Sequence, residues 1–305
     1  MGSQPLTMFC MSATTFNEDG SLDEYALREH LRRLVAGRNG IYLGSGGAGE
    51  GHVLTVKELR RVYDIGVEEA KGKVPVHANP RESRSAAAMY EVAKEAVEAG
   101  VDVVQLYQLD GGHGMRPSQR EQEAYWKELL DKINHPVAIS IHIYAGYMAT
   151  VPYLKELCGR YGQICAINVM VPANGYFIQL RDALPESVKL YTGLTQLGEV
   201  ATLGAAGALL AENNIIPNIC QRIADGYAAG DLAEVSEATR NVQRFNNIVS
   251  EWAPSTARWV KMAMRVLNLG SGALRPPYLM PLEEDQRRMS ASFDALMIRE
   301  LEGLR

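Results

Sequence analysis

The chain has 305 residues, 47% of them apolar and 22% charged, with a formal net charge of −5 and a pI near 5.8. This composition supplies enough apolar residues for one large core or two modest ones. The acidic balance argues against nucleic acid and anionic membranes as partners, because both bind clustered Lys and Arg side chains.

Features that direct a chain into or across a membrane are not seen. No apolar run approaches the length needed to cross a bilayer, and the first ten residues lack a basic segment followed by a long apolar one. Four cysteines are scattered without any CxxC pairing: Cys10, Cys158, Cys165 and Cys220. We therefore expect a cytoplasmic protein with reduced, mostly buried thiols.

Short apolar runs alternate with segments of helical period along the first two thirds of the chain. The predicted strands are residues 6–13, 40–45, 74–79, 101–107, 137–144, 164–171, 188–194 and 207–213. Residues 23–37, 55–72 and 85–100 are typical of the helices between them, and the last two end on Gly72 and Gly100. Eight alternating units predict a parallel sheet closed into a (β/α)8 barrel, with an open doubly wound sheet as the alternative.

Beyond about residue 217 the pattern is purely helical. Residues 220–252, 256–270 and the end of segment 274–301 all show helical period. We predict a barrel over residues 1–220 and a C-terminal helical region over 221–305, packed on the barrel as part of the same domain unit.

A glycine-rich segment, GSGGAG at residues 44–49, follows the second strand. It matches a dinucleotide fingerprint only formally, because such a motif needs a helix to begin on its last glycine. Here the helix is predicted to begin after Thr55, with Glu58 completing a capping box. The segment is better interpreted as a loop at the barrel mouth whose backbone N–H groups hold an anion.

Polar side chains gather near the predicted carboxyl ends of strands, where barrel enzymes build their sites. His52, His77, His113 and His142 fall there, without the spacing of a metal motif; Glu50 and Glu212 are the carboxylates that could join them. In AISIHIYAGY, a period of two places Ser140, His142 and Tyr144 on one strand face. Three polar groups on one face indicate the lining of a wet cavity.

Several segments together resemble the dihydrodipicolinate synthase/N-acetylneuraminate lyase family of barrel aldolases. They are TTFNEDGSLDEYALREHLRRLV, GGAGEGHVLTVKELRRV, RPSQREQEAYWKEL, GAAGALLAENNIIP and VKMAMRVLNLGSGALRPPYLMPLEEDQ. The resemblance covers nearly the whole chain. It implies a (β/α)8 barrel, a small carboxylate substrate, no cofactor, and a homo-oligomer (dimer or tetramer).

The family's chemistry depends on a lysine at the end of strand six, which forms an imine with a 2-oxo acid. Aligning QICAINVM with that strand places Asn168 at the lysine position, and an amide nitrogen cannot form the imine. The nine lysines of the chain are predicted to lie on helices or at strand starts, the wrong end of the barrel for a substitute.

The resemblance also assigns the surrounding positions. Ser140 stands where the family has its proton-carrying tyrosine, with Tyr144 nearby, and Gly47 and Ala48 replace its paired threonines. The fourth-loop tyrosine has no direct counterpart, which leaves Tyr107 upstream and His113 near its position. The remaining substrate-binding candidates are the loop residues Gly46, Gly49 and Glu50 and the last-strand residue Leu209.

We therefore expect a lyase for a small oxo- or hydroxy-acid that works without the imine. The catalytic candidates are His142, Tyr144, His113, Ser140 and Asn168, with the 46–50 loop holding the substrate anion. Two alternatives stay open: a non-catalytic metabolite-binding or regulatory protein, and a metal-assisted lyase that uses the histidines of the mouth.

Overall fold

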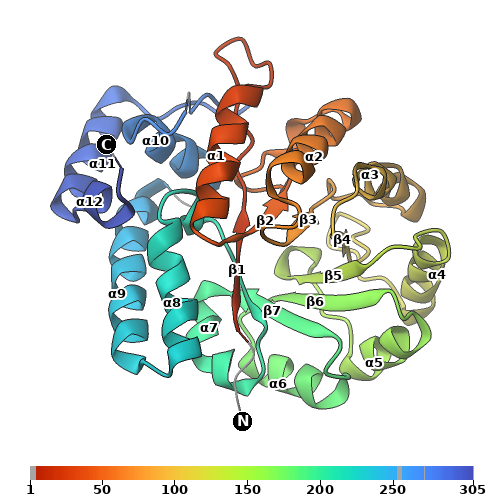
Figure 1. The fold of residues 1–305 in the computed structure, drawn as a ribbon. Coiled ribbons are helices and arrows are strands. Elements are labelled where there is room, and N and C mark those ends of the chain that lie inside the picture. The colour runs from red at the N-terminus through yellow and green to blue at the C-terminus, as the bar shows by residue number, and fades with distance from the viewer. Residues whose placement is uncertain (1–4, 253–255, 271, 305) are drawn as a thin grey trace.

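The computed structural model describes residues 5–252, 256–270 and 272–304. Eight strands within these residues form a closed parallel barrel in chain order, which confirms the predicted fold (Figure 1). The strands are β1 (Thr7–Met11), β2 (Gly40–Leu43), β3 (Val76–Ala78), β4 (Val103–Tyr107), β5 (Val137–His142), β6 (Ile164–Met170), β7 (Lys189–Gly193) and β8 (Gly207–Leu210).

Each strand is followed by a helix on the outside of the barrel. These are α1 (Glu24–Ala36), α2 (Val56–Ala70), α3 (Ala86–Ala99), α4 (Gln119–Leu130), α5 (Val151–Arg160), α6 (Asn174–Ala183), α7 (Leu194–Val200) and α8 (Pro217–Ala229). The predicted caps are present: Thr55 and Glu58 form a capping box at α2, and Gly100 ends α3 with a φ of 85°. A side chain at that φ is strained, so glycine fits there.

Two apolar layers hold the barrel together. The larger lies between the strands and the surrounding helices. The smaller fills the bore, where Phe9 packs against Tyr42 and Tyr191 at ring-centroid distances of 5.2 Å. The His77 ring packs against this cluster, with its centroid 4.3 Å from that of Phe9. Side chains, several of them aromatic, therefore fill the bore. Within the barrel, a binding cavity can form only at the carboxyl ends of the strands and in the loops that follow them.

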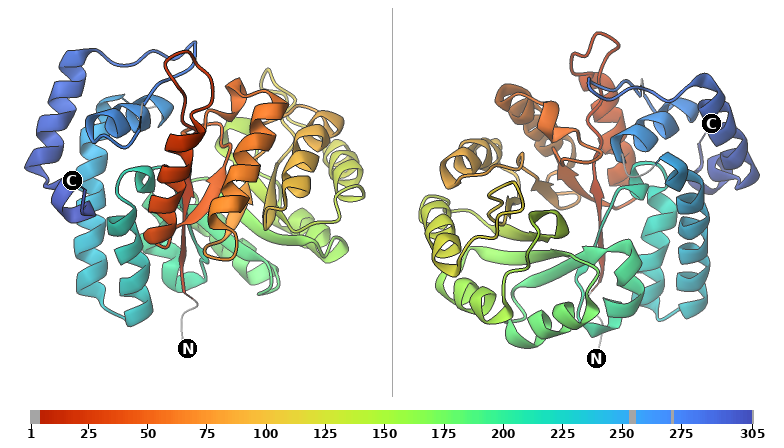
Figure 2. Two further views of the ribbon diagram at one scale, coloured as in Figure 1. Left: turned by 45° about the horizontal axis from the view of Figure 1, so that its top comes forward. Right: turned by 180° about the vertical axis from the view of Figure 1, so that it is seen from behind.

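The C-terminal region comprises α9 (Leu232–Val249), α10 (Thr256–Val266), α11 (Glu283–Ala295) and α12 (Ile298–Glu302). These helices lie together on one side of the barrel, beside α8 and α1 (Figures 1 and 2). The predicted boundary at residue 220 falls inside α8, which contacts β1 and is the eighth helix of the barrel. The limits 1 and 305 lie outside the described residues.

The cysteines of the described chain are free thiols, with Cys10, Cys158 and Cys220 buried. Among the described residues, no helix combines the length and apolar character needed to span a bilayer.

Candidate active site

Neighbouring strands bring four side chains to one level of the barrel. Tyr107 of β4 pairs with Ser140 of β5, Ser140 with Asn168 of β6, and Asn168 with Tyr191 of β7. Paired residues of parallel strands share a face. Tyr191 and Ala166, two residues before Asn168, belong to the bore cluster, so this ladder faces the bore. Asn168, the position that the resemblance aligned with the family's lysine, therefore lies inside the barrel.

Asn168 is the centre of a buried network of neutral groups. Its side chain has 0% exposure. The amide nitrogen donates to the Tyr42 hydroxyl at 2.9 Å and to Gln105 Oε1 at 2.5 Å. Gln105 in turn donates through Nε2 to Asn79 Oδ1 at 2.8 Å. This chain of hydrogen bonds fixes the amides and places neutral dipoles at this level of the bore.

Tyr107, the last residue of β4, belongs to the same network. Burial raises the pKa of its hydroxyl, while hydrogen bonds to Asn79 and Gln105 oppose that shift. Burial also raises the pKa of Tyr42. Both phenols therefore stay protonated near neutral pH, where they serve as hydrogen-bond donors and not as bases.

Sequence reasoning missed three members of this network, Tyr42, Asn79 and Gln105. A signal was present, because each is a polar residue in or directly after an otherwise apolar strand. Like Ser140 and His142, they are polar groups that an apolar strand would bury at a cost unless they line a polar site. What no single strand reveals is that they converge on one side chain.

The predicted polar face of β5 is only partly correct. Ser140 lies in the strand and is 1% exposed, and His142 is its last residue. Tyr144 is not on this face, because the chain turns into a short 3-10 segment at Ile143–Ala145 and leaves Tyr144 78% exposed. The Tyr144 ring still lies 4.3 Å from the His142 ring.

His142 is the best-placed titratable group of the mouth. Burial lowers the pKa of its imidazole, so the ring is neutral near pH 7. Nδ1 accepts the backbone N–H of Tyr144 at 3.3 Å, which places the proton on Nε2. In this form Nε2–H can donate to a substrate oxygen.

The other predicted histidines do not form a cluster. His77 is buried in the bore against Phe9 and Tyr42, and burial lowers its pKa to about 3. His113 is exposed in the loop after β4, and His52 is exposed in the short 3-10 segment Gly51–Val53. Among the described residues, no three His, Cys, Asp or Glu side chains lie close enough to hold a metal ion. The described part of the mouth therefore offers individual imidazoles and no group of side chains assembled around a metal.

The glycine-rich loop after β2 is held largely by its own hydrogen bonds. The N–H of Gly49 donates to Ser45 Oγ at 3.1 Å, and that of Glu50 to the Gly47 carbonyl at 3.1 Å. These two amides are therefore not free for an anion, which corrects the prediction for two of the five residues of the 46–50 loop. Gly46 is exposed, Gly47 half-buried and Ala48 buried, and the Gly47 Cα faces Thr256 of α10.

Glu50 points away from solvent and binds a lysine. Both side chains of the Glu50–Lys261 pair have 0% exposure, and Lys261 Nζ lies 2.9 Å from Glu50 Oε1. Lys261 also donates to the Ala273 carbonyl at 2.9 Å. Burial lowers the pKa of Lys261, and the Glu50 charge opposes this shift. The prediction that every lysine lies at the wrong end of the barrel is wrong for Lys261.

A cavity of about 350 Å³ opens at the carboxyl ends of β7, β8 and β1, under α9 and α10. Its floor includes Leu209, which the resemblance assigned to substrate binding, and Met11. Glu212, Thr195 and Thr256 supply polar groups to the wall. This volume suits a small molecule.

The sequence of the chain matches a family of known proteins. The profile of the dihydrodipicolinate synthetase family matches residues 5–295. The chain belongs to this family.

Relatives of known name agree over most of their length. The 4-hydroxy-tetrahydrodipicolinate synthase of Chlorobium phaeovibrioides is 27% identical over 291 residues, covering 93% of this chain and 94% of that protein. The protein of the same name from Bradyrhizobium diazoefficiens is 29% identical over 278 residues, covering 88% and 89%.

Solved structures share the fold at lower identity. Dihydrodipicolinate synthase from Aquifex aeolicus superimposes with a TM-score of 0.85 at 19% identity, covering 96% of this chain and 98% of that one. A prophage protein of the family from E. coli K12, solved with pyruvate, gives 0.86 at 17% identity, covering 96% and 99%. At these identities the likeness establishes the barrel with its C-terminal helices.

Proposed function

We propose that this member of the family is a lyase for a small oxo- or hydroxy-acid, and that its chemistry runs without a lysine imine. The observation that carries the proposal is Asn168. It lies on β6 in the bore, where the resemblance places the family's lysine, and its nitrogen is already bound to Tyr42 and Gln105. An amide lone pair is delocalised into its carbonyl, so it is no nucleophile toward a keto carbon.

The neighbouring groups support a binding and proton-transfer role. Phenols and amides around Asn168 are donors suited to a carbonyl or hydroxyl oxygen. His142 presents a neutral imidazole, which can exchange a proton near neutral pH. In this proposal Ser140 and Tyr107 orient the substrate, and the Gly46–Ala48 segment and Leu209 form its binding surface.

Lys261 is the amine nearest to the glycine-rich loop that could form an imine in place of the family's lysine, but it is held in an ion pair. Its ammonium is paired with Glu50 and sealed from solvent. Reaction with a keto acid needs a neutral amine that the substrate can reach. The buried ion pair opposes both requirements.

Borohydride reduction in the presence of pyruvate tests the proposal. Reduction converts an imine into a stable secondary amine, so an imine-forming enzyme gains mass. We expect the mass of this protein to stay unchanged. Peptide mass mapping locates any adduct, and the exposed Lys57 serves as the matched comparison within the same chain. An adduct on Lys261 but not on Lys57 would overturn the proposal.

The variant N168K asks whether the amine alone restores imine chemistry. We expect no pyruvate aldolase activity, because the tyrosine and threonines that move protons are absent and such groups act as a unit. Recovery of full aldolase turnover in N168K would show that the surrounding residues still serve the imine route.

A non-catalytic metabolite-binding protein is the second candidate. It is favoured by one observation: Asn168, Ser140 and Tyr42 are each at most 1% exposed, so the polar centre is closed in this state. A panel of 2-oxo acids and sugar acids, assayed for both binding and product formation, separates the two. Binding without turnover supports this candidate, and turnover supports the lyase.

A further inference from the structure

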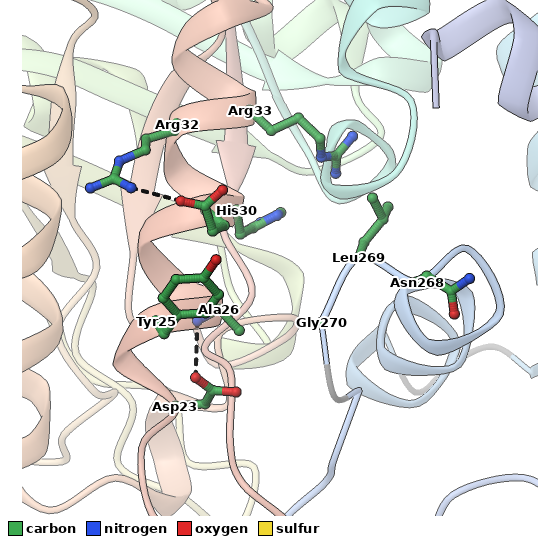
Figure 3. A pocket seen from close by; sticks show the side chains of 10 residues that line it. Asp23, Tyr25, Ala26, His30, Arg32, Arg33, Asn268, Leu269 and Gly270 are labelled. Atoms are coloured by element: carbon green, nitrogen blue, oxygen red, sulfur yellow. Dashed lines mark hydrogen bonds and ion pairs between the residues drawn. The ribbon is translucent and has the colours of Figure 1, made fainter. Parts of the chain in front are cut away.

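A second cavity lies outside the barrel, away from the mouth. Its volume is about 640 Å³, and it separates α1 from the turn Asn268–Gly270 that follows α10 (Figure 3). His30 and Arg33 project from α1 toward this turn, with Leu269 facing them. Asp23 marks the opposite end of the α1 wall.

His30 brings an unused acceptor to this wall. Its Nε2 lies 2.9 Å from Asn214 Oδ1. The orientation of that amide is fixed, because Asn214 Nδ2 donates to the Met11 and Ala211 carbonyls at 2.9 and 2.8 Å. Nε2 must therefore carry the proton, which leaves Nδ1 with a lone pair.

No partner for this Nδ1 occurs within the described part of the chain, although the residue is only 2% exposed. Burial and the nearby Arg33 charge lower the His30 pKa to about 3, so the ring is neutral at physiological pH. A buried acceptor without a donor is unfavourable by an amount comparable to a lost hydrogen bond. A ligand hydroxyl that reaches Nδ1 would satisfy it.

Arg33 brings a cation one turn further along the helix. In the described structure its guanidinium donates to the main-chain carbonyls of Ile215 and Asn214. Burial lowers the pKa of Arg33, and the charge of Glu302 opposes this shift without a hydrogen bond. Three of its five N–H groups remain. Arg32 differs, since Glu69 and Glu29 already neutralise it at 2.8 and 2.6 Å.

Two carboxylates line the cavity, and both are engaged. Glu29 accepts a hydrogen bond from Arg32 at 2.6 Å, and Asp23 lies at the far end. Asp23 caps α1 through Ala26 N at 2.9 Å. Ten residues along a helix correspond to about 15 Å, so Asp23 is remote from Arg33, whereas His30 is only one turn away. The Arg33 end is thus a place for an anion, with the His30 acceptor beside it.

We propose that this cavity is a binding site for a small hydroxylated anion. The acidic group pairs with Arg33 through its remaining N–H groups, and a hydroxyl donates to His30 Nδ1. His30 and Arg33 lie one turn apart on α1, so a single ligand can contact both with its hydroxyl and its acidic group.

The site is joined to the mouth by a short hydrogen-bonded path. His30 contacts Asn214, and Asn214 holds the carbonyls of Met11 and Ala211 at the ends of β1 and β8. Met11 and Ala211 also line the mouth cavity. A ligand that reorients His30 therefore acts on two strand ends that form the floor of that cavity.

Calorimetric titration of the full chain with glycerol 3-phosphate, inorganic phosphate and glycerol tests the site. We expect saturable binding of glycerol 3-phosphate, weaker binding of phosphate, and no detectable binding of glycerol. R33M should weaken glycerol 3-phosphate binding by at least ~10-fold, the usual effect of losing a charged hydrogen bond. R38M is the matched control, because Arg38 follows the same helix but pairs with Asp225 on the surface.

L269W provides a test that leaves both polar groups in place. The larger ring should occlude the cavity and abolish binding. The ¹⁵N resonance of His30 Nδ1 should move on addition of glycerol 3-phosphate, as expected for a lone pair that gains a donor. Absence of binding by every probe, or equal binding by R33M, L269W and R38M, would overturn the proposal, as would an unmoved Nδ1 resonance at saturation.

Discussion

Two buried polar clusters near the mouth of the barrel differ in how they avoid unpaired charge. In the bore, Asn168, Gln105 and Tyr42 form a network of neutral groups. At the glycine-rich loop, Lys261 and Glu50 form an ion pair with both side chains fully enclosed. Breaking a hydrogen bond of the neutral network leaves no charge unpaired, whereas separating the ion pair would leave a bare charge in a poor solvent.

The ion pair consequently has a structural role. It joins the loop after β2 to α10, and Arg275 extends the junction by donating from its backbone N to Glu50 Oε2 at 3.3 Å. The chain thus places a buried lysine at the mouth end of the barrel as a brace, and an amide in the bore. Variants that disturb one cluster at a time should therefore differ in their effect on the free energy of unfolding.

The largest effect is expected from K261M. It leaves the Glu50 carboxylate buried without its cation, which typically lowers the free energy of unfolding by about 3–5 kcal/mol. Urea denaturation measures the change. The double variant K261M/E50Q should recover part of the loss, because the uncompensated charge is gone. The exposed Lys57 gives the control variant K57M. If K261M lowers the free energy of unfolding no more than K57M does, the Lys261–Glu50 pair does not stabilise the fold.

Glu302 extends the comparison to a buried carboxyl that has no ion-pair partner among the described residues. It accepts the N–H groups of Asn218 and Ile219 at the start of α8, at 3.1 and 3.0 Å. Burial raises its pKa to about 7 from an ordinary 4.5. The folded state therefore binds this proton more tightly than the unfolded state does.

The stabilising contribution of Glu302 is fully present below about pH 4.5 and is lost as the pH rises through 7. A shift of this size corresponds to roughly 3 kcal/mol in the free energy of unfolding. Urea denaturation at several pH values should show this decline, and E302Q should flatten it. The exposed Glu300 provides the control variant E300Q. A decline that persists unchanged in E302Q would assign the effect to another group.

A smaller effect is expected from N168A. The Tyr42 hydroxyl and Gln105 Oε1 lose the donor between them, and an unsatisfied buried group costs about 1–3 kcal/mol. Urea denaturation should report a loss of about 2 kcal/mol, below that of K261M. N247A changes an exposed amide on α9 and should be silent. If N168A proves as destabilising as K261M, the bore network has as large a structural role as the ion pair.

The sequence by itself determined the order of the elements. Alternating apolar runs and helical segments predicted each strand within a few residues, and Thr55 with Glu58 predicted the start of α2, because these signals depend on neighbouring residues alone. The same reasoning placed Asn168 at the end of a buried strand. It failed at Tyr144, since a period of two holds only while the chain stays extended, and a turn at Ile143 ends the strand.

Tertiary structure decided which distant side chains meet. The barrel's closure brings Tyr42, Gln105 and Asn168 together across the bore from strands far apart in sequence. Lys261 reaches Glu50 only because α10 returns over the mouth, more than 200 residues later. Period and propensity describe one element at a time, so they carry no information on such meetings. Long-range packing sets those contacts, and with them the neutral bore, the charged brace and the cavity beside His30.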